Sequence, residues 1–532
     1  MRRETYPRAW PIALFFAFLT LFWCLPSRDY LAVDGALRCL GVYFDPTLLF
    51  HGNNHLLYPF WVSLWSRLAH AIGIRASDAF QFMRMSQAMN GFFGAASIAL
   101  LCSILQLLVE DRIALLCSLI FGFSTALSLH STNAAEPLPG LFFSLLGVRV
   151  LMAALLRHRR SLLILAGVCL SLALASYQAM GTIAGVAAFA CVWWSWTRSK
   201  DAAARDALGP LLSVALGGLL GVCGIYGFAY SHQNIPLLQM PHQFFSIVGS
   251  EIYSGISVSN ILNVPFGLLR NLFSGVPLRY TGIRALLRDP QRMFWIPAAI
   301  AGLATVGAVT WMASKALWRV SRKWPRRLIL AGLGAIALLC LPLVYWDAAY
   351  DKLWLLPLAV ATAVVAIGFR PELLGPGERK VLTTLLIIVL ATEMSVSLPR
   401  VWESHFTATP HLADAEDVNR LIQPRDLVVL DFDNVSTLWL AFWGQRTQFL
   451  LLPSSNLTSA SQWLAAARQS ARRTDARIIF IGVLDQDRQS WENFLGKRVG
   501  IPFSLLDEYR DHATILQRYS LENGSVTLRA YK

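Results

Sequence analysis

The chain has 532 residues, of which 55% are hydrophobic and only 15% are charged, and its net charge is +14 at pH 7. Soluble domains carry about 25% charged residues, so the composition excludes an ordinary soluble protein. Basic and acidic residues balance in 398–532, with 15 of each, and the whole excess of positive charge therefore lies in 1–397. There it clusters in short segments between apolar runs, which indicates membrane topology signals and no nucleic-acid surface.

Apolar runs of about 17–25 residues, the length that crosses a hydrocarbon core, recur from Trp10 to Val396. They predict a multi-pass α-helical membrane protein. The first run lacks a small-residue cleavage site and is therefore expected to stay as the first span. Predicted spans cover residues 10–26, 81–109, 113–129, 138–156, 161–176, 180–196, 210–230, 291–313, 328–346, 353–369 and 380–396.

The segment LLYPFWVSLWSRLAHAIG (56–73) decides whether the chain crosses the membrane eleven or twelve times. With eleven crossings and an inner N-terminus, 19 Lys and Arg fall in inner segments, and the short outer loops hold only Lys352. Twelve crossings would move most of these basic loops outside, against the positive-inside tendency. The segment also contains Arg67, His70 and several aromatic residues. We therefore predict eleven spans, with 56–73 as a helix in the headgroup layer.

This topology leaves three segments on the outer face: the loops 27–80 and 231–290, and a terminal domain at 398–532. In that domain LVVLD (427–431), TQFLLL (447–452) and ARIIFIG (476–482) are typical of buried strands, and 459–470 is typical of an amphipathic helix. We predict a transmembrane domain at 1–397 and a soluble, extracytoplasmic α/β domain at 398–532.

Ionisable side chains gather at the outer mouth of the predicted helical bundle. The first outer loop contains Asp29 and Asp34 and continues into HGNNHLLYP (51–59). The turn STNAAEPLPG between the third and fourth spans contains Glu136 as its single charge, and Arg84 opens the second span. Ionisable groups in such places indicate a functional site.

These features resemble the GT-C superfamily of polyprenyl-phosphate-sugar-dependent glycosyltransferases, which includes protein O-mannosyltransferases and aminoarabinose transferases. The resemblance lies in one inside-out span followed by an outer loop with an acid and an H-x-x-Y-P-like element. An Arg-led span and an Ala-Glu-Pro turn complete it. Residues 1–200 share these motifs, and 200–400 share only the layout. Two positions differ, because Gly35 replaces the second acid that some members have after Asp34, and Glu136 replaces an Asp.

The resemblance implies that Asp34 is the catalytic carboxylate of the first loop, which acts as a general base and accepts the proton of an attacking acceptor hydroxyl. It implies that Glu136 orients the acceptor or helps to hold a divalent cation, the one possible cofactor. Direct displacement of the lipid phosphate would invert the anomeric centre. The expected partners are a polyprenyl-phosphate-linked sugar donor, a glycan, lipid or protein acceptor, and the bilayer of a bacterial inner (plasma) membrane. Substrate-binding positions are expected at Asp29, His55, Tyr58, Arg84, Arg279, Arg284 and Lys352.

Simpler interpretations of these side chains stay open. Asp34 could be a surface carboxylate and Asp29 a helix cap, while His55 could face headgroups and Arg84 could extend to the interface. Leu56, Leu57 and Phe60 are expected to hold the surface helix in lipid. In the terminal domain, Asp431 and Asp433 form a D-x-D pair, which we interpret as ordinary turn chemistry at a strand end.

Other functions also remain possible on the sequence alone. A transporter or flippase of lipid-linked glycans would place ionisable groups near the membrane centre, where these spans are nearly free of charge. An O-antigen polymerase or ligase would place basic residues in a late outer loop, as 231–290 partly does. A scaffold without catalytic activity would use the terminal domain to bind a partner.

Overall fold

The computed structural model describes most of the helical part and part of the C-terminal domain. The described residues are 9–27, 35, 38–39, 42–43, 56–77, 79–198, 203–232, 258–272, 304, 306–312, 314–315, 318–319, 326–345, 351–370, 373–406, 420–423, 426–431, 448–452, 468–469, 476–485, 487–492, 503–521 and 524–531. The chain divides into two compact units, the first of which takes in Met1–Ser27, Thr47–Arg67 and Ser86–His405. The second takes in Arg28–Pro46, Leu68–Met85 and Phe406–Lys532.

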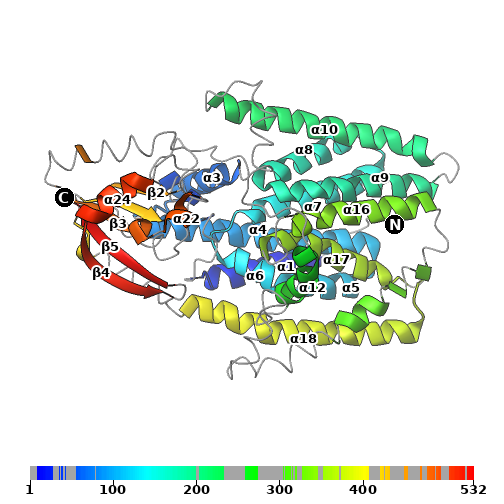
Figure 1. Ribbon diagram of the computed structural model, residues 1–532. Helices are drawn as coiled ribbons and strands as arrows, with labels where there is room; N and C mark the ends of the chain where they lie inside the picture. The colour runs from blue at the N-terminus through cyan, green and yellow to red at the C-terminus, as the bar shows by residue number, and fades with distance from the viewer. Residues whose placement is uncertain are drawn as a thin grey trace. The chain divides into compact units, whose positions relative to one another are not determined.

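Long helices make up the first unit (Figure 1). Their bounds are α1 (Ala9–Cys24), α3 (Tyr58–Ala71), α4 (Ala79–Leu108), α5 (Asp111–Phe123), α6 (Thr125–Thr132), α7 (Pro137–Arg157), α8 (Arg160–Ser176), η2 (Gln178–Thr182), α9 (Ile183–Arg198), α10 (Ala203–His232), α12 (Val258–Leu272), α16 (Arg326–Tyr345), η5 (Asp351–Trp354), α17 (Leu355–Gly368) and α18 (Pro376–Phe406). Helices α3 and α4 begin and end in different units.

The predicted spans coincide closely with these helices, except that 291–313 lies mostly outside the described residues. Among the described residues, six helices are long and apolar enough to cross a membrane, or seven if the bent pair α5–α6 counts as one span. Three further apolar helices, α1, α8 and part of α16, are shorter than that criterion requires. A helical membrane protein is therefore confirmed, while the count of eleven spans stays a prediction.

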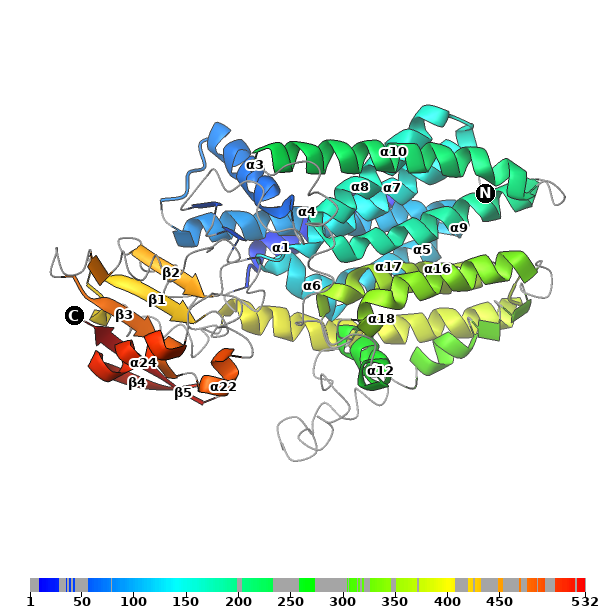
Figure 2. The ribbon, with the colours of Figure 1, turned by 45° about the horizontal axis from the view of Figure 1, so that its top comes forward.

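Helices α7, α8, α9, α10 and α16 run side by side (Figure 2). Two glycines allow the closest of these approaches, between α8 and α10. A Cβ atom on Gly167 would overlap the Val214 carbonyl oxygen, and one on Gly217 would overlap the Ile164 carbonyl oxygen. Small residues at helix crossings let membrane helices pack backbone to backbone, which supplies van der Waals contact where lipid gives no hydrophobic drive.

The predicted span 113–129 is a broken helix. The chain bends by 60° between α5 and α6, because Ser124 adopts an extended conformation (φ −55°, ψ 140°) and donates its hydroxyl to the Phe121 carbonyl. Sharp kinks are typical of Gly and Ser pairs, and Gly122 precedes the break. All eight residues of α6 are buried, so this short helix lies inside the bundle and leads directly into the turn that contains Glu136.

Helix α3 forms where the interfacial helix was predicted, but its start packs on protein. Leu56 and Leu57 are 0% and 5% exposed and lie in a cluster with residues of α8 and α10. The Leu57 amide donates to the Ala175 carbonyl, and the Trp61 indole donates to the Ser176 hydroxyl at 3.0 Å. The expectation that Leu56 and Leu57 hold this helix in lipid is therefore wrong, because both side chains fill the space between neighbouring helices.

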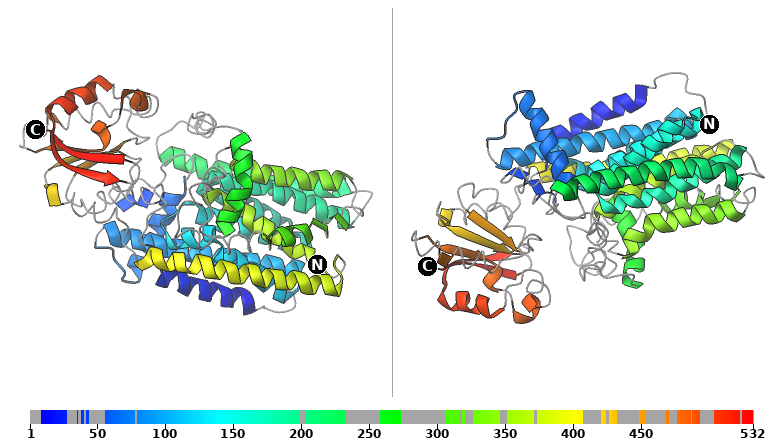
Figure 3. Two further views of the ribbon diagram at one scale, coloured as in Figure 1. Left: turned by 60° about the horizontal axis from the view of Figure 1, so that its bottom comes forward. Right: turned by 90° about the horizontal axis from the view of Figure 1, so that it is seen from above.

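The second unit contains a mixed five-stranded sheet in the order β2-β1-β3-β5-β4. Strand β1 pairs in parallel with β2 and β3, whereas β5 pairs antiparallel with β3 and β4. Helix α24 covers one face of this sheet (Figure 3). The elements are β1 (Leu427–Asp431), β2 (Gln448–Leu452), β3 (Ile478–Ile481), η6 (Val483–Asp485), α22 (Arg488–Ser490), α24 (Phe503–His512), β4 (Thr514–Leu521) and β5 (Gly524–Tyr531).

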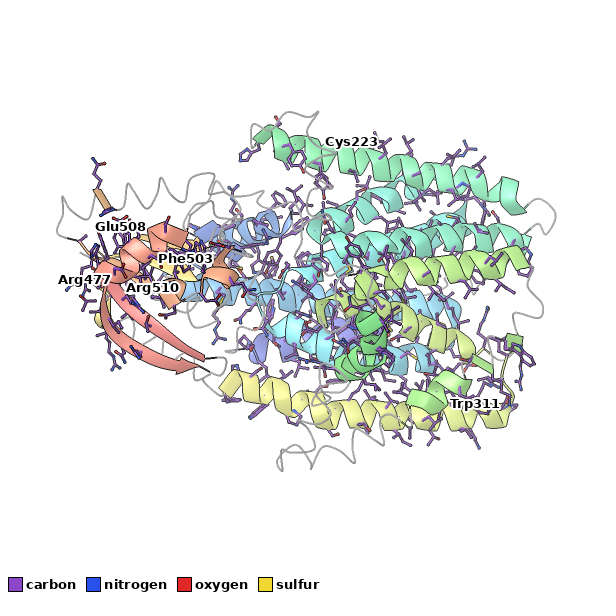
Figure 4. The ribbon with its side chains drawn as sticks, viewed as in Figure 1. Cys223, Trp311, Arg477, Phe503, Glu508 and Arg510 are labelled. Atoms are coloured by element: carbon purple, nitrogen blue, oxygen red, sulfur yellow. The ribbon has the colours of Figure 1, made fainter. Side chains whose placement is uncertain are left out.

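The three predicted strands are β1, β2 and β3, and the hairpin β4–β5 was not predicted. The predicted helix at 459–470 lies almost entirely outside the described residues, as does Asp433. Polar residues of this unit serve its structure: the Asp485 carboxylate accepts hydrogen bonds from the Thr527 amide and hydroxyl, both at 2.6 Å. The Arg510 guanidinium lies over the Phe503 ring on α24, with its carbon 5.1 Å from the ring centroid (Figure 4).

Candidate active site

The turn between α6 and α7 is fixed by Asn90 of α4. The Asn90 side-chain amide donates to the carbonyl oxygens of Asn133 at 2.7 Å and Ala135 at 2.8 Å. Asn90 is 0% exposed, so these two hydrogen bonds satisfy turn carbonyls that water cannot reach. The residue after this turn segment is Glu136, and the position of its carboxylate is therefore set by a buried contact from another helix.

The end of α1 is tied to the same region. The Ser27 amide donates to the Thr132 carbonyl at 2.9 Å, and the Gln87 side chain donates to the Ser27 carbonyl at 2.8 Å. Tyr58, at the start of α3, accepts a long hydrogen bond of 3.4 Å from Asn90. Tyr58 is 0% exposed, so this predicted substrate-binding residue lies inside the protein and is linked to the Glu136 turn through the Asn90 side chain.

Glu136 and Lys352 form an ion pair between segments far apart in the sequence. The Lys352 Nζ atom lies 3.5 Å from Glu136 Oε1, and the two side chains are 22% and 2% exposed. Glu136 lies between the turn and Pro137, the first residue of α7. A buried carboxylate is strongly destabilised without a counter-ion, and the lysine supplies one. The structure thus brings together two of the predicted site residues.

A second acid–base contact joins the same two segments. His130, in the last turn of α6, places its Nε2 atom 3.4 Å from Asp351 Oδ1 in η5, at ion-pair distance. The same Asp351 oxygen accepts the backbone amide of Lys352 at 2.9 Å. Arg270, in the last turn of α12, interacts favourably with the Asp351 charge. The amide contact helps to position the backbone at Lys352.

We name Glu136, Lys352, His130, Asp351 and Arg270 the charged cluster. His130 lies in α6, Glu136 in the turn after it, Asp351 and Lys352 in η5, and Arg270 in α12; helices α6, η5 and α12 contact one another. The cluster thus combines two carboxylates with one lysine, one arginine and one histidine. Such an arrangement can receive an anion, because a lysine and an arginine are present as donors, and it retains carboxylates that can accept the protons of hydroxyl groups.

Of the other six predicted site residues, the structure describes only Arg84. Asp29, Asp34, His55, Arg279 and Arg284 lie outside the described residues. Arg84 lies near the start of α4 and is half-buried, and it belongs to the second unit. The assignment of these six residues to the site therefore stays a prediction.

Sequence reasoning missed His130, Asp351 and Arg270. A weak signal was available for the first two, since Asp351 directly precedes Lys352, and His130 lies just before the Glu136 turn. For Arg270 the sequence offers no comparable signal, because α12 lies in a long loop and only its packing against η5 brings the side chain close.

A metal site is not assembled from the described part of the chain. Among those residues, no group of three or more His, Cys, Asp or Glu side chains could hold a metal ion. Of the predicted site residues that the structure describes, Glu136 has the one carboxylate that could contribute to a divalent cation, and the cation itself stays a prediction.

The comparisons place this architecture among solved structures. No family model and no curated protein matches the sequence. The crystal structure of ArnT from Cupriavidus metallidurans bound to undecaprenyl phosphate aligns with a TM-score of 0.56, at 9% identity over 98% of both chains. The structure of the same ArnT in the apo state aligns with a TM-score of 0.56, at 10% identity over 98% of this chain and 97% of that one.

Archaeal AglB from Archaeoglobus fulgidus aligns with a TM-score of 0.46, at 11% identity over 98% of this chain and 74% of that chain. The fold assignment rests on the two ArnT structures, which align with the higher TM-score. At 9–10% identity they establish the fold alone. The chain therefore shares the fold of ArnT, which agrees with the resemblance drawn from the sequence.

Proposed function

We propose that the protein is an integral-membrane glycosyltransferase that moves a sugar from a polyprenyl-phosphate donor to an acceptor on the extracytoplasmic side. The observation that carries the proposal is the buried Glu136–Lys352 pair, with His130, Asp351 and Arg270 around it, in a chain with the fold of ArnT. One of the ArnT structures is bound to undecaprenyl phosphate, which supports a lipid phosphate as the partner of this chain.

The proposed reaction requires two tasks, which are assigned to different residues: binding the departing lipid phosphate and removing the proton of the acceptor hydroxyl. The leaving group is a lipid phosphate, which needs cationic donors more than a general acid. Lys352 and Arg270 are suited to binding the phosphate. Arg279 and Arg284, in the same outer loop as Arg270, are suited to it as well. The acceptor hydroxyl is a poor nucleophile, and Asp34 takes its proton as it attacks C1, which inverts the anomeric centre. Glu136 orients the acceptor.

The proposal includes the location of the chain. It crosses a bacterial inner membrane eleven times, with the terminal domain from residue 398 on the outer face. The closeness of the Ser27 end of α1, the Glu136 turn and η5 supports a site at one end of the bundle. This favours an enzyme over a transporter or flippase, for which we would expect such a cluster near the middle of the spans.

The proposal is tested by mass spectrometry of lipids that co-purify with the full chain. We expect polyprenyl phosphate from the unchanged protein, because turnover leaves the bare lipid. Asp34→Asn should lower the rate of sugar transfer about a hundredfold or more, since it removes a general base. The lipid that co-purifies with this variant should retain the sugar. Asp45→Asn, in the same loop, is the matched control and should behave as the unchanged protein.

Two results would contradict the proposal. Absence of any polyprenyl phosphate from all three preparations would exclude the lipid donor. Unchanged transfer in a well-folded Asp34→Asn protein, judged by gel filtration and circular dichroism, would exclude Asp34 as the base. Movement of intact lipid-linked glycan across vesicles without bond cleavage would favour the flippase, and elongation of the glycan would favour the polymerase or ligase.

A further inference from the structure

Helix α12 buries three asparagines and exposes apolar side chains on another side. Asn260, Asn263 and Asn271 are 7%, 1% and 1% exposed, whereas Ile261 and Leu262 are 51% and 52% exposed. We define the polar face of α12 as Asn260, Asn263, Gly267, Arg270 and Asn271, which recur at the three- and four-residue spacing of one helix side; all are buried except Arg270, which is half-buried.

This orientation is the reverse of that in a soluble protein and is expected where lipid covers the outer side. In lipid the apolar side chains face outward, and polar groups face the protein interior or a water-filled space. The polar face of α12 is therefore directed toward the neighbouring segments of the bundle. Helix α12 contacts α6, α16 and η5, and the Thr125 hydroxyl lies 3.5 Å from the Leu272 carbonyl at its end.

The carboxamides on this face differ in how far their hydrogen bonds are satisfied. Asn260 donates to the Val344 carbonyl at 3.1 Å and so joins α12 to α16. Asn271 donates to the Gly267 carbonyl of its own helix at 2.7 Å. Among the described residues, the Oδ1 atoms of Asn263 and Asn271 are buried and accept no hydrogen bond. A buried acceptor without a donor is destabilising, so each is expected to receive one from a bound molecule.

The helix that contains these unsatisfied acceptors also contributes Arg270 to the charged cluster. Arg270, between Asn263 and Asn271 in the sequence, acts on Asp351, and α12 itself contacts η5. A phosphate group would be bound by the cations of that cluster, not by amide oxygens. A carboxamide presents one acceptor and one N–H₂ donor side by side, which matches the hydroxyl groups of a sugar, each of them both donor and acceptor.

We propose that the polar face of α12 is the sugar-binding wall of the site, and that the Asn263 and Asn271 carboxamides bind hydroxyl groups of the lipid-linked sugar. The inference rests on the proposed function and deepens it, because it assigns recognition of the sugar and of the phosphate to different residues. Asn260 holds the wall in place against α16. The chemical class that it binds is a polyhydroxylated sugar ring attached to a polyprenyl phosphate.

The test compares lipids that co-purify with the full-length Asp34→Asn protein and with Asp34→Asn/Asn263→Leu. Leucine has nearly the shape of asparagine but no hydrogen-bonding group. We expect the ratio of sugar-bearing to bare polyprenyl phosphate, measured by mass spectrometry, to fall at least tenfold. Binding of added undecaprenyl phosphate, which has no sugar, should stay within twofold. Leu262→Ala, on the exposed side of α12, is the matched control and should change neither quantity.

Each outcome bears on one proposal. An unchanged ratio in the Asn263→Leu background would mean that Asn263 holds only water, and the sugar-binding wall would be wrong. An equal loss of undecaprenyl phosphate binding would mean a structural role and would also overturn it. If the leucine variant does not fold, Asn263→Ser and Asn263→Ala replace it, and serine, which keeps a hydroxyl, should retain more sugar-bearing lipid than alanine. Absence of polyprenyl phosphate from every preparation would count against the proposed function instead.

Discussion

The Glu136–Lys352 pair is a structural contact between two residues of the proposed site. The Glu136 side chain is 2% exposed and the Lys352 side chain 22% exposed. The lysine is therefore the partner that a ligand would reach more easily. Sequence alone indicated both residues as candidates, since each is a charge in a short loop between spans. Their meeting across more than two hundred positions depended on the packing of η5 against α6.

Lys352→Met is expected to lower the free energy of unfolding by about 3 kcal/mol, the lower end of the range for breaking a buried pair, because the lysine is partly exposed. The loss arises from the Glu136 carboxylate left without a counter-ion. The double variant Glu136→Gln/Lys352→Met should regain most of it. A double-mutant cycle on purified protein, followed by thermal unfolding in one detergent, measures the coupling. Simple additivity of the two single effects would contradict the pairing.

The helices differ in how well the sequence predicted them. Long apolar runs such as those of α4, α7 and α8 were predicted nearly to their ends, because a run that crosses a membrane must satisfy its backbone hydrogen bonds within itself. The break at Ser124 and the orientation of α12 were not predicted, since both depend on neighbours. In the second unit the segment around Asn523-Gly524 is a hairpin signal, and attention to it would have predicted β4 and β5.

The crossing of α8 and α10 makes a prediction about backbone approach. Gly217→Ala should destabilise the bundle by about 1–3 kcal/mol, the usual effect of overpacking, because the new Cβ would overlap the Ile164 carbonyl oxygen. Gly224→Ala on the same helix is the control, since nothing lies within 4 Å of its Cβ position. That variant should be neutral or gain up to about 1 kcal/mol of helix propensity. Equal unfolding midpoints for the two variants would contradict the close crossing.

The chain as a whole combines a helical membrane unit with a unit built on a mixed β-sheet. The distribution of charge predicts on which side of the membrane the C-terminal domain lies. Nineteen Lys and Arg in predicted inner segments outweigh the single Lys352 in the short outer loops. Charge in short loops sets orientation because basic residues resist transfer across the membrane. The eleven-span topology and the domain boundary at 397/398 remain predictions, and α18 continues through that boundary to Phe406.

A tag added after Lys532 should be accessible to protease from the extracytoplasmic side of spheroplasts. A tag between α9 and α10, in a segment predicted to be inside, is the control and should be degraded only after the membrane is broken. Immunoblots before and after lysis distinguish the two. Protection of the C-terminal tag, with the control behaving as expected, would show that the number of crossings is even and not odd.

By itself the sequence determined the membrane class, the positions of most helices and three strands of the sheet, and it indicated Glu136 and Lys352 as site candidates. These features depend on local apolar length, periodicity and charge, which each segment carries wherever it lies. Only the tertiary structure decided that Glu136 meets Lys352, that His130 meets Asp351, and that α12 turns its asparagines inward. Such facts depend on which segments pack together, and packing is a property of the whole chain that no single stretch of it encodes.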